Sequence, residues 1–102
     1  MAYTVPVELE WDQRKDEANQ RKHGLGFAEA STLFSSGVDY LEVFDVEHSD
    51  HEERFIAIGP IRRGLVLVVW TERVEDTIRI ISARWASNRE RELYRRHAEG
   101  GR

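Results

Sequence analysis

Four arginines with the chemistry to hold a phosphate lie on or beside segments expected to form neighbouring strands: Arg54, Arg73, Arg79 and Arg84. The guanidinium group stays charged and makes paired hydrogen bonds, so a cluster of them suits a phosphodiester and the phosphorane formed when it is cleaved. The other interpretation is that they pair across strands with acidic neighbours, each pair contributing little stability: Glu53, Glu72, Glu75 and Asp76. The sequence leaves the two interpretations open.

Lys22 and His23 form a second candidate pair, in the last turn of a helix expected at residues 12–23. Histidine changes charge near neutral pH, so a lysine beside a histidine could bind phosphate or transfer a proton. The alternative is a solvated cationic helix end that offsets the helix dipole. Taken alone, this helix favours the alternative.

His48 and His51 lie in an acidic stretch, residues 47–53, whose imidazole and carboxylate groups are those that bind divalent cations. A bound metal would offer one route to phosphodiester hydrolysis. The stretch is expected to be a surface loop without a helical frame to set ligand geometry, so a hydrated loop is favoured. The absence of cysteine excludes disulfides, thiolate nucleophiles and cysteine-based metal sites.

Alternating hydrophobicity and turn residues predict the strands that must position these groups. Strands are expected at residues 7–11, 40–44, 54–58, 65–71 and 77–83. Short links join the last three, which predicts an antiparallel meander.

Helix caps predict the remaining elements. Asp12 begins the first helix and Gly24 ends it, with Ala18 as its only clear core contact, and a second helix is expected at residues 27–34. Ser87 and Glu90 form a capping box that begins the last helix. The order of elements predicts an α+β domain with a single antiparallel sheet of four to five strands, two N-terminal helices and one C-terminal helix.

Length and composition bound the class of protein. With 102 residues, 40% hydrophobic and 33% charged, the chain is expected to form one domain over residues 1–102, with flexible ends at 1–6 and 98–102. No apolar run approaches a membrane-spanning length and the N-terminus lacks a signal-peptide pattern, so a cytoplasmic location is expected.

Charge is unevenly distributed along the chain. The net charge is −4, but residues 1–53 carry 4 basic and 13 acidic side chains (net −9), whereas residues 54–97 carry 10 basic and 5 acidic ones (net +5). Such asymmetry hints at a polyanion partner for the second half. Arginines on exposed faces explain it equally simply, and charge alone favours that explanation.

Taken together, these segments resemble the BrnT family of toxins from type II toxin–antitoxin systems. The resemblance spans about residues 8–95 and rests on short matches in a fixed order: Glu10-Trp11-Asp12, Asn19, Lys22-His23-Gly24, Phe27, Ala30, Asp45, His48-Ser49, residues 53–59, Val68-Val69, Thr71, Arg73, residues 79–84, Ala86, Glu90-Arg91 and Tyr94. Each match is weak alone, and their order and spacing carry the resemblance.

The resemblance implies a RelE-like fold and a ribonuclease activity that halts translation and growth. It also implies a BrnA-type antitoxin that neutralises the toxin and contacts operator DNA, which the toxin itself does not read. Two features depart from the family: Trp85 stands where a basic residue is common, and the net charge is acidic.

The mechanism expected from these residues needs no metal or other cofactor. The RNA 2′-hydroxyl attacks the adjacent phosphorus, which requires proton transfer and stabilisation of negative charge. His23 is the candidate for proton transfer, and the candidate cations are Lys22, Arg54, Arg73, Arg79 and Arg84. The candidate RNA contacts are Tyr94, Trp85 and Arg91, with Tyr94 serving as a stacking ring or a secondary acid.

Two alternatives belong to other classes. The chain could be a non-catalytic interaction module, an inactivated toxin that binds antitoxin or acts as a corepressor. It could also be a metal-dependent nuclease that uses His48 and His51.

Overall fold

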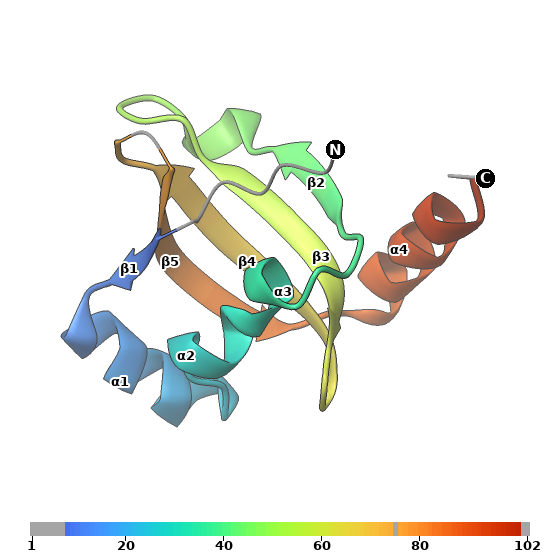
Figure 1. Cartoon of the computed structure of the whole chain (residues 1–102), viewed down its shortest axis with the longest axis horizontal. Helices are drawn as coiled ribbons and strands as arrows, with labels where there is room; N and C mark the ends of the chain where they lie inside the picture. Colours follow the sequence, from blue (N-terminus) through green and yellow to red (C-terminus); the bar gives the residue numbers. More distant parts are fainter. Residues whose placement is uncertain (1–7, 75, 101–102) are drawn as a thin grey trace, which may run out of the picture.

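The computed structural model describes residues 8–74 and 76–100, which form one five-stranded sheet with its helices arranged around it (Figure 1). The strands are β1 (Glu8–Trp11), β2 (Leu41–Phe44), β3 (Phe55–Ile61), β4 (Gly64–Glu72) and β5 (Thr77–Trp85), in the spatial order β1-β5-β4-β3-β2. The α+β class and the single sheet are confirmed, and β2 to β5 form the expected antiparallel meander. β1 pairs in parallel with β5, so the sheet is mixed rather than wholly antiparallel. Parallel neighbours need a long connection rather than a hairpin, and the chain between β1 and β5 includes α1 to α3.

One face of the sheet is buried. Ala57, Val68 and Ala83 lie opposite one another on β3, β4 and β5, and each is at most 1% exposed. Side chains alternate between the two faces of a strand, so these three residues define the core face. Helix and loop residues pack against it: Leu25, Phe27, Ala30 and Leu33.

Three short helices cover the core face: α1 (Gln13–His23), α2 (Phe27–Ala30) and α3 (Thr32–Ser35). As predicted, the Asp12 side chain caps α1 by accepting from two backbone N–H groups, and Gly24 ends it in the left-handed conformation at φ 65°. The single helix expected at residues 27–34 is instead divided at Ser31, whose hydroxyl donates to the Ala28 carbonyl. α3 reaches β3 closely because Gly59 has no side chain to meet Leu33.

The buried side of α1 is polar. Asp16 and Asn19 are 7% and 8% exposed, whereas Ala18, expected to be the core contact, points to solvent. β1 ends at Trp11 opposite Ile80, so β5 has no strand neighbour on that side beyond this point. Asn19 takes the place of one: its Nδ2 donates to the Ala83 carbonyl (2.7 Å) and its Oδ1 accepts from the Ala83 N–H (3.3 Å).

The same two residues fix the chain that follows α1. Asn19 Nδ2 also donates to the Leu25 carbonyl at 2.8 Å, and Asp16 Oδ1 accepts from the Phe27 N–H at 2.7 Å, at the start of α2. Buried backbone groups need such partners, since leaving one unmatched costs about 1–3 kcal/mol. The polar side of α1 therefore docks the helix where an apolar stripe would usually do so.

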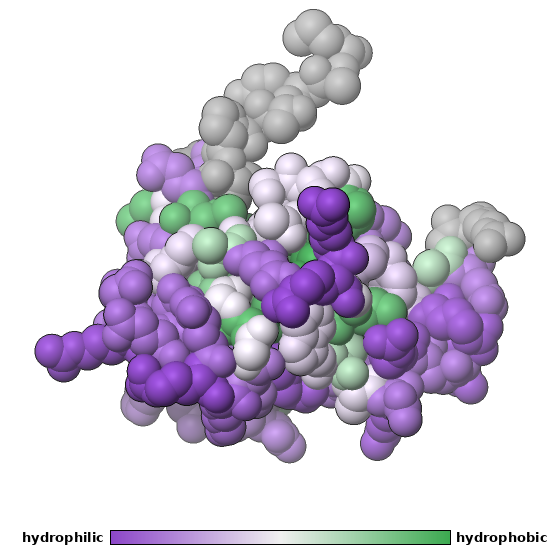
Figure 2. Space-filling view, turned by 90° about the horizontal axis from the view of Figure 1, so that it is seen from below, coloured by the Kyte–Doolittle hydropathy of each residue, from purple (hydrophilic) through white to green (hydrophobic). Residues whose placement is uncertain are grey.

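α4 (Asn88–Gly100) begins with the predicted capping box, in which Glu90 N–H donates to Ser87 Oγ and Ser87 N–H donates to Glu90 Oε1. The helix stands off from the sheet, none of its residues is buried, and its surface is mostly hydrophilic (Figures 1 and 2). Residues 98–100, expected to be flexible, continue α4, and the other expected flexible residues lie outside the described ranges. No helix in the described ranges is long and apolar enough to cross a membrane.

Glu90 also ties α4 to the end of β5. It accepts two hydrogen bonds from Arg84, Nη1 to Oε1 at 2.8 Å and Nη2 to Oε2 at 2.7 Å. These bonds, assisted by those with Ser87, lower the pKa of Glu90 to about 2.

Replacing Asn19 by aspartate is expected to lower the free energy of unfolding by about 2–4 kcal/mol, because a carboxylate cannot donate to the Leu25 and Ala83 carbonyls. Denaturant unfolding followed by circular dichroism measures the loss. Asn88→Asp makes the same change on the exposed first turn of α4 and is expected to alter stability by less than about 0.5 kcal/mol. Equal losses in the two variants would show that the Asn19 bonds contribute little.

The Glu90 ion pair predicts a pH dependence of stability. Its pKa of about 2 lies below the ordinary value of 4.5, so its contribution is present above pH 4.5 and is lost as the pH falls towards 2. Allowing for solvent screening, we expect the wild type to lose about 1–2 kcal/mol more than Glu90→Gln between about pH 5 and 2. Urea unfolding at a series of pH values measures this difference, and parallel curves for the two proteins would contradict it.

Candidate active site

The open face of the sheet, opposite α1 to α3, carries a hollow of about 400 Å³. Its floor includes Ile56, Leu67 and Val69, which point away from the core because their strand neighbours point into it. Charged and titratable groups stand around this floor: Asp45, Glu47, His48, Arg54, Arg84 and Glu90. Cations beside an apolar floor can hold an anion more strongly than they would in open water.

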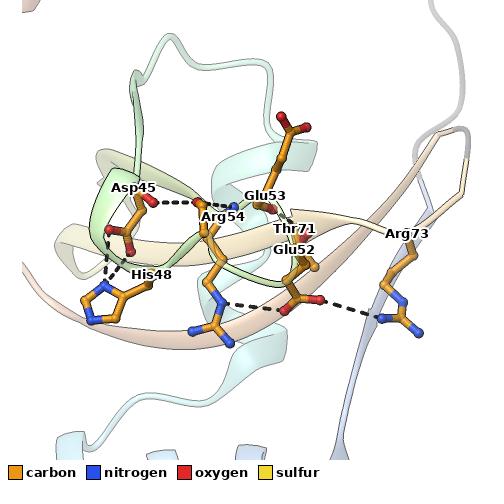
Figure 3. Close-up of polar contacts among 8 residues, drawn as sticks. Asp45, His48, Glu52, Glu53, Arg54, Thr71 and Arg73 are labelled. Carbon is orange, nitrogen blue, oxygen red and sulfur yellow. Dashed lines mark hydrogen bonds and ion pairs between the residues drawn. The ribbon is translucent and has the colours of Figure 1, made fainter.

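The loop between β2 and β3 supplies four of these groups, Asp45, Glu47, His48 and Arg54, and is closed on itself. It contains the 3-10 helix η1 (Val46–His48). At its neck, Asp45 N–H donates to the Arg54 carbonyl at 2.8 Å, while the Ser49 hydroxyl donates to the Asp45 carbonyl (2.5 Å) and accepts from Arg54 N–H (3.0 Å). The Thr71 hydroxyl on β4 holds the Glu53 carbonyl at 2.6 Å (Figure 3). The expectation of a loop without a frame is therefore wrong.

His48 is oriented by Asp45 within this loop. Its Nδ1 lies 3.2 and 3.1 Å from the two oxygens of the Asp45 carboxylate (Figure 3). The Asp45 side chain is 12% exposed and that of His48 is 64% exposed. The carboxylate therefore sets the direction of the ring while Nε2 stays accessible.

Arg54 carries the least engaged cation of the hollow. Its Nε is 3.5 Å from Glu52 Oε1, and the other Glu52 oxygen is 3.8 Å from Arg73 Nη1, so one carboxylate lies between two guanidinium groups (Figure 3). Within the described ranges, Arg54 Nε is buried and has no hydrogen-bond partner. A guanidinium with unmatched donors is suited to donate hydrogen bonds to the oxygens of a phosphate.

Arg84 lines the same hollow but is already committed to Glu90. Its bonds to Glu90 raise the pKa of Arg84 above its ordinary value. An anion that binds Arg84 has to compete with the two hydrogen bonds to Glu90. An anion that binds Arg54 competes only with the 3.5 Å contact between Arg54 and Glu52.

Of the predicted cations, Lys22, Arg73 and Arg79 do not line this hollow, and neither does His23, the candidate for proton transfer. Arg79 pairs with Glu10 on β1 at 2.9 Å and lies about 16 Å before Arg84 along β5. A register shift between β4 and β5 at Val69/Trp70 adds one residue to β5, so Arg79 and Arg84 share a face. Lys22 and His23 end α1, which packs on the opposite face. The structure therefore brings together Arg54 and Arg84, with Arg73 joined to them only through Glu52, and separates them from Lys22 and His23.

Among the described residues, the strand arginines pair with carboxylates other than Glu53, Glu72 and Asp76, the neighbours named in the alternative interpretation. In the described part of the chain, Arg54 and Arg73 contact Glu52, Arg79 contacts Glu10 and Arg84 contacts Glu90, none of which was expected. Strand register and the approach of β1 and α4 set these pairs, and neither follows from distance along the sequence. Glu75, another expected partner, lies outside the described ranges.

The three expected RNA contacts do not line this hollow. Trp85 lies on the core face, where its Nε1 donates to the His23 carbonyl at 3.2 Å and the Arg63 guanidinium lies 5.1 Å from its ring centroid. The Tyr94 hydroxyl donates to the Asp39 carbonyl at 3.0 Å, and Arg91 shares with Tyr94 a separate hollow on α4.

The described residues also bear on the metal interpretation of His48 and His51. Over residues 8–74 and 76–100, no three His, Asp or Glu side chains gather as ligands of one metal ion. The His48 nitrogen that lies closest to a carboxylate faces Asp45 alone.

Sequence reasoning missed Asp45 and Ser49 as site residues. Asp45 and His48 are three residues apart, a spacing that brings side chains together only in a helical turn. The turn is η1, and the sequence carries no clear signal for it.

Comparison with known proteins identifies the family. Residues 11–90 match the model of a family described as the ribonuclease toxin BrnT of type II toxin–antitoxin systems. The crystal structure of the Brucella abortus ribonuclease toxin BrnT is similar, with a TM-score of 0.60 and 25% sequence identity over 80% of this chain and 99% of that one. No curated protein matches the sequence. Because the family match covers most of its length, the chain belongs to the BrnT family of ribonuclease toxins.

Proposed function

We propose that this protein cleaves RNA in the hollow on the open face of the sheet, without a metal ion. The RNA 2′-hydroxyl attacks the adjacent phosphorus, and the products are a 2′,3′-cyclic phosphate and a 5′-hydroxyl. The observation that carries the proposal is the convergence of Arg54 and Arg84 on one apolar-floored hollow in a member of a ribonuclease family.

Arg54 is the cation proposed to bind the scissile phosphate. Its guanidinium makes only the loose contact with Glu52, so a phosphate gains full hydrogen bonds there at little cost. Arg84 adds a second positive charge that Glu90 holds in place. Charge that grows on the phosphorane is stabilised most by groups already in position.

Arg79 and the proton-transfer candidate His23 lie outside the hollow and take secondary parts in this proposal. Arg79, on the same face and paired with Glu10, is placed to contact a flanking phosphate rather than the cleaved one. Proton transfer by His23 would need a substrate bound at the opposite face, where α1 lies. Cleavage by His23→Ala at the full wild-type rate would remove His23 from the mechanism.

Replacing Arg54 by alanine is expected to lower the rate of RNA cleavage about 100-fold, the usual loss for one positioned donor to a developing charge. The backbone, not the side chain, of Arg54 closes the loop, so the fold should persist. Purified protein is assayed on bulk RNA with excess EDTA. Arg62→Ala, which removes an exposed arginine outside the hollow, is the matched control and is expected to cleave at the wild-type rate.

Two results of that assay would contradict the proposal. Equal rates for Arg54→Ala and wild type would place the chemistry elsewhere. Loss of wild-type cleavage in EDTA, restored by a divalent cation, would make the nuclease metal-dependent.

Membership of a type II family implies an antitoxin partner. We infer that this partner is a BrnA-type protein that neutralises the toxin by binding it and contacts operator DNA, and that RNA cleavage inhibits translation. Induction of the wild-type chain alone is expected to arrest growth, and co-expression of the antitoxin to restore it. Arg54→Ala at the same protein level should leave growth unaffected. Normal growth with abundant, folded wild-type protein would favour the non-catalytic interaction module.

A further inference from the structure

The Asp45–His48 pair belongs to the same hollow as Arg54 and Arg84, and the roles given above leave its imidazole unused. We propose that His48 is the general base of RNA cleavage and that Asp45 is the residue that positions it. This inference rests on the proposed ribonuclease function and adds to it the group that takes the proton from the 2′-hydroxyl.

Asp45 determines which ring nitrogen is available. Its largely buried carboxylate accepts a hydrogen bond from Nδ1 at 3.1 Å, so the neutral ring carries its proton on Nδ1. The lone pair is then on Nε2, on the far side of the ring from Asp45. A carboxylate behind Nδ1 and a free Nε2 is also the arrangement that orients the base in serine hydrolases.

The base and the phosphate-binding cation are held by one closed loop. η1 brings Asp45 and His48 together, and the neck hydrogen bonds of Asp45 and Ser49 fix the backbone of Arg54 at 2.8 and 3.0 Å. The side chains of His48 and Arg54 leave this loop towards the same side (Figure 3). A positioned base beside a positioned cation is the pair that attack by a 2′-hydroxyl requires.

The other three histidines lack this combination. His23 lies at the end of α1 on the opposite face. His51 lies outside the hollow that holds Arg84. His97 on α4 is paired through Nε2 with Asp39 at 3.1 Å, so the nitrogen that would act as base is already occupied.

The proposed step conserves atoms and charge. Nε2 of neutral His48 takes the proton of the 2′-hydroxyl as O2′ forms a bond to the adjacent phosphorus. The bond from phosphorus to O5′ breaks, its electron pair stays on O5′, and O5′ takes a proton from water. The imidazolium then returns its extra proton to solvent, so water is the only other reactant.

Several charged groups act on this ring and shape its pH dependence. Glu47, Arg54, Arg84 and Glu90 face it with Asp45 from the hollow, and further charged or titratable groups share the outer side of the loop: Asp50, His51 and Glu52. Because the acidic and basic groups act on the ring in opposite directions, the test compares the pH–rate profiles of variants and does not rely on one titration midpoint.

The test measures the pH–rate profile for cleavage of an oligoribonucleotide by the full chain. His48→Gln is expected to lower the rate about 100–1,000-fold and to remove the acid limb of the profile, while binding of the uncleavable 2′-deoxy oligonucleotide stays unchanged. Asp45→Asn should lower the rate at least about tenfold. His97→Gln, which removes a histidine on α4 outside the hollow, is the matched control and should keep the wild-type rate and profile.

A second readout does not depend on activity. NMR of the ring nitrogens of His48 should show the proton on Nδ1 in the neutral wild type and a mixture of the two forms in Asp45→Asn. A wild-type rate and profile for His48→Gln, with Arg54→Ala inactive, would overturn the role of His48 and leave the proposed function standing. Absence of cleavage by the wild type itself would overturn the proposed function, and the inference with it.

Discussion

The hydrogen bonds between the Asn19 side chain and the backbone of Ala83 are the constraint on which the rest of the structure depends. β1 stops pairing with β5 at Ile80, yet β5 continues into the core. The amide of an asparagine side chain carries a donor N–H and an acceptor oxygen, as a peptide group does, so Asn19 can replace a strand residue at that edge. By also holding Leu25, it sets the turn from which α2 and α3 lie over the core.

Docking the helices on one face leaves the other face open for chemistry, and strand alternation decides which residues go to each. Arg84 and Trp85 are consecutive, yet Arg84 points to the hollow with Glu90, whereas Trp85 packs beside the end of α1 under Arg63. The departure from the family pattern at Trp85 therefore bears on how α1 is held rather than on the charge of the hollow.

The hollow is nearly balanced in charge, which bears on how an acidic chain would bind RNA in the proposed function. In the hollow, the two arginines Arg54 and Arg84 face three carboxylates: Asp45, Glu47 and Glu90. Elsewhere in residues 54–97, most of the excess arginines form ion pairs, for example Arg63 with Glu29 and Arg95 with Glu92. Attraction of RNA by a broad basic surface is therefore weak, and recognition in the proposed function depends on a few placed cations and on the loop that carries them.

The sequence by itself determined the elements whose signals are local. Asp12 and Gly24 bound α1, Ser87 and Glu90 begin α4, and alternation predicted the meander, because caps and strand periodicity depend only on near neighbours. It also brought Arg54 and Arg84 forward as candidates. Only the tertiary structure decided that Asp16 and Asn19, not Ala18, form the buried side of α1. It also decided that the partners of the strand arginines are Glu52, Glu10 and Glu90. Finally, it decided that His48 rather than His23 shares the hollow with Arg54. Those outcomes depend on which backbone groups lose their strand neighbours and on which face each side chain meets, and contacts between distant segments set both.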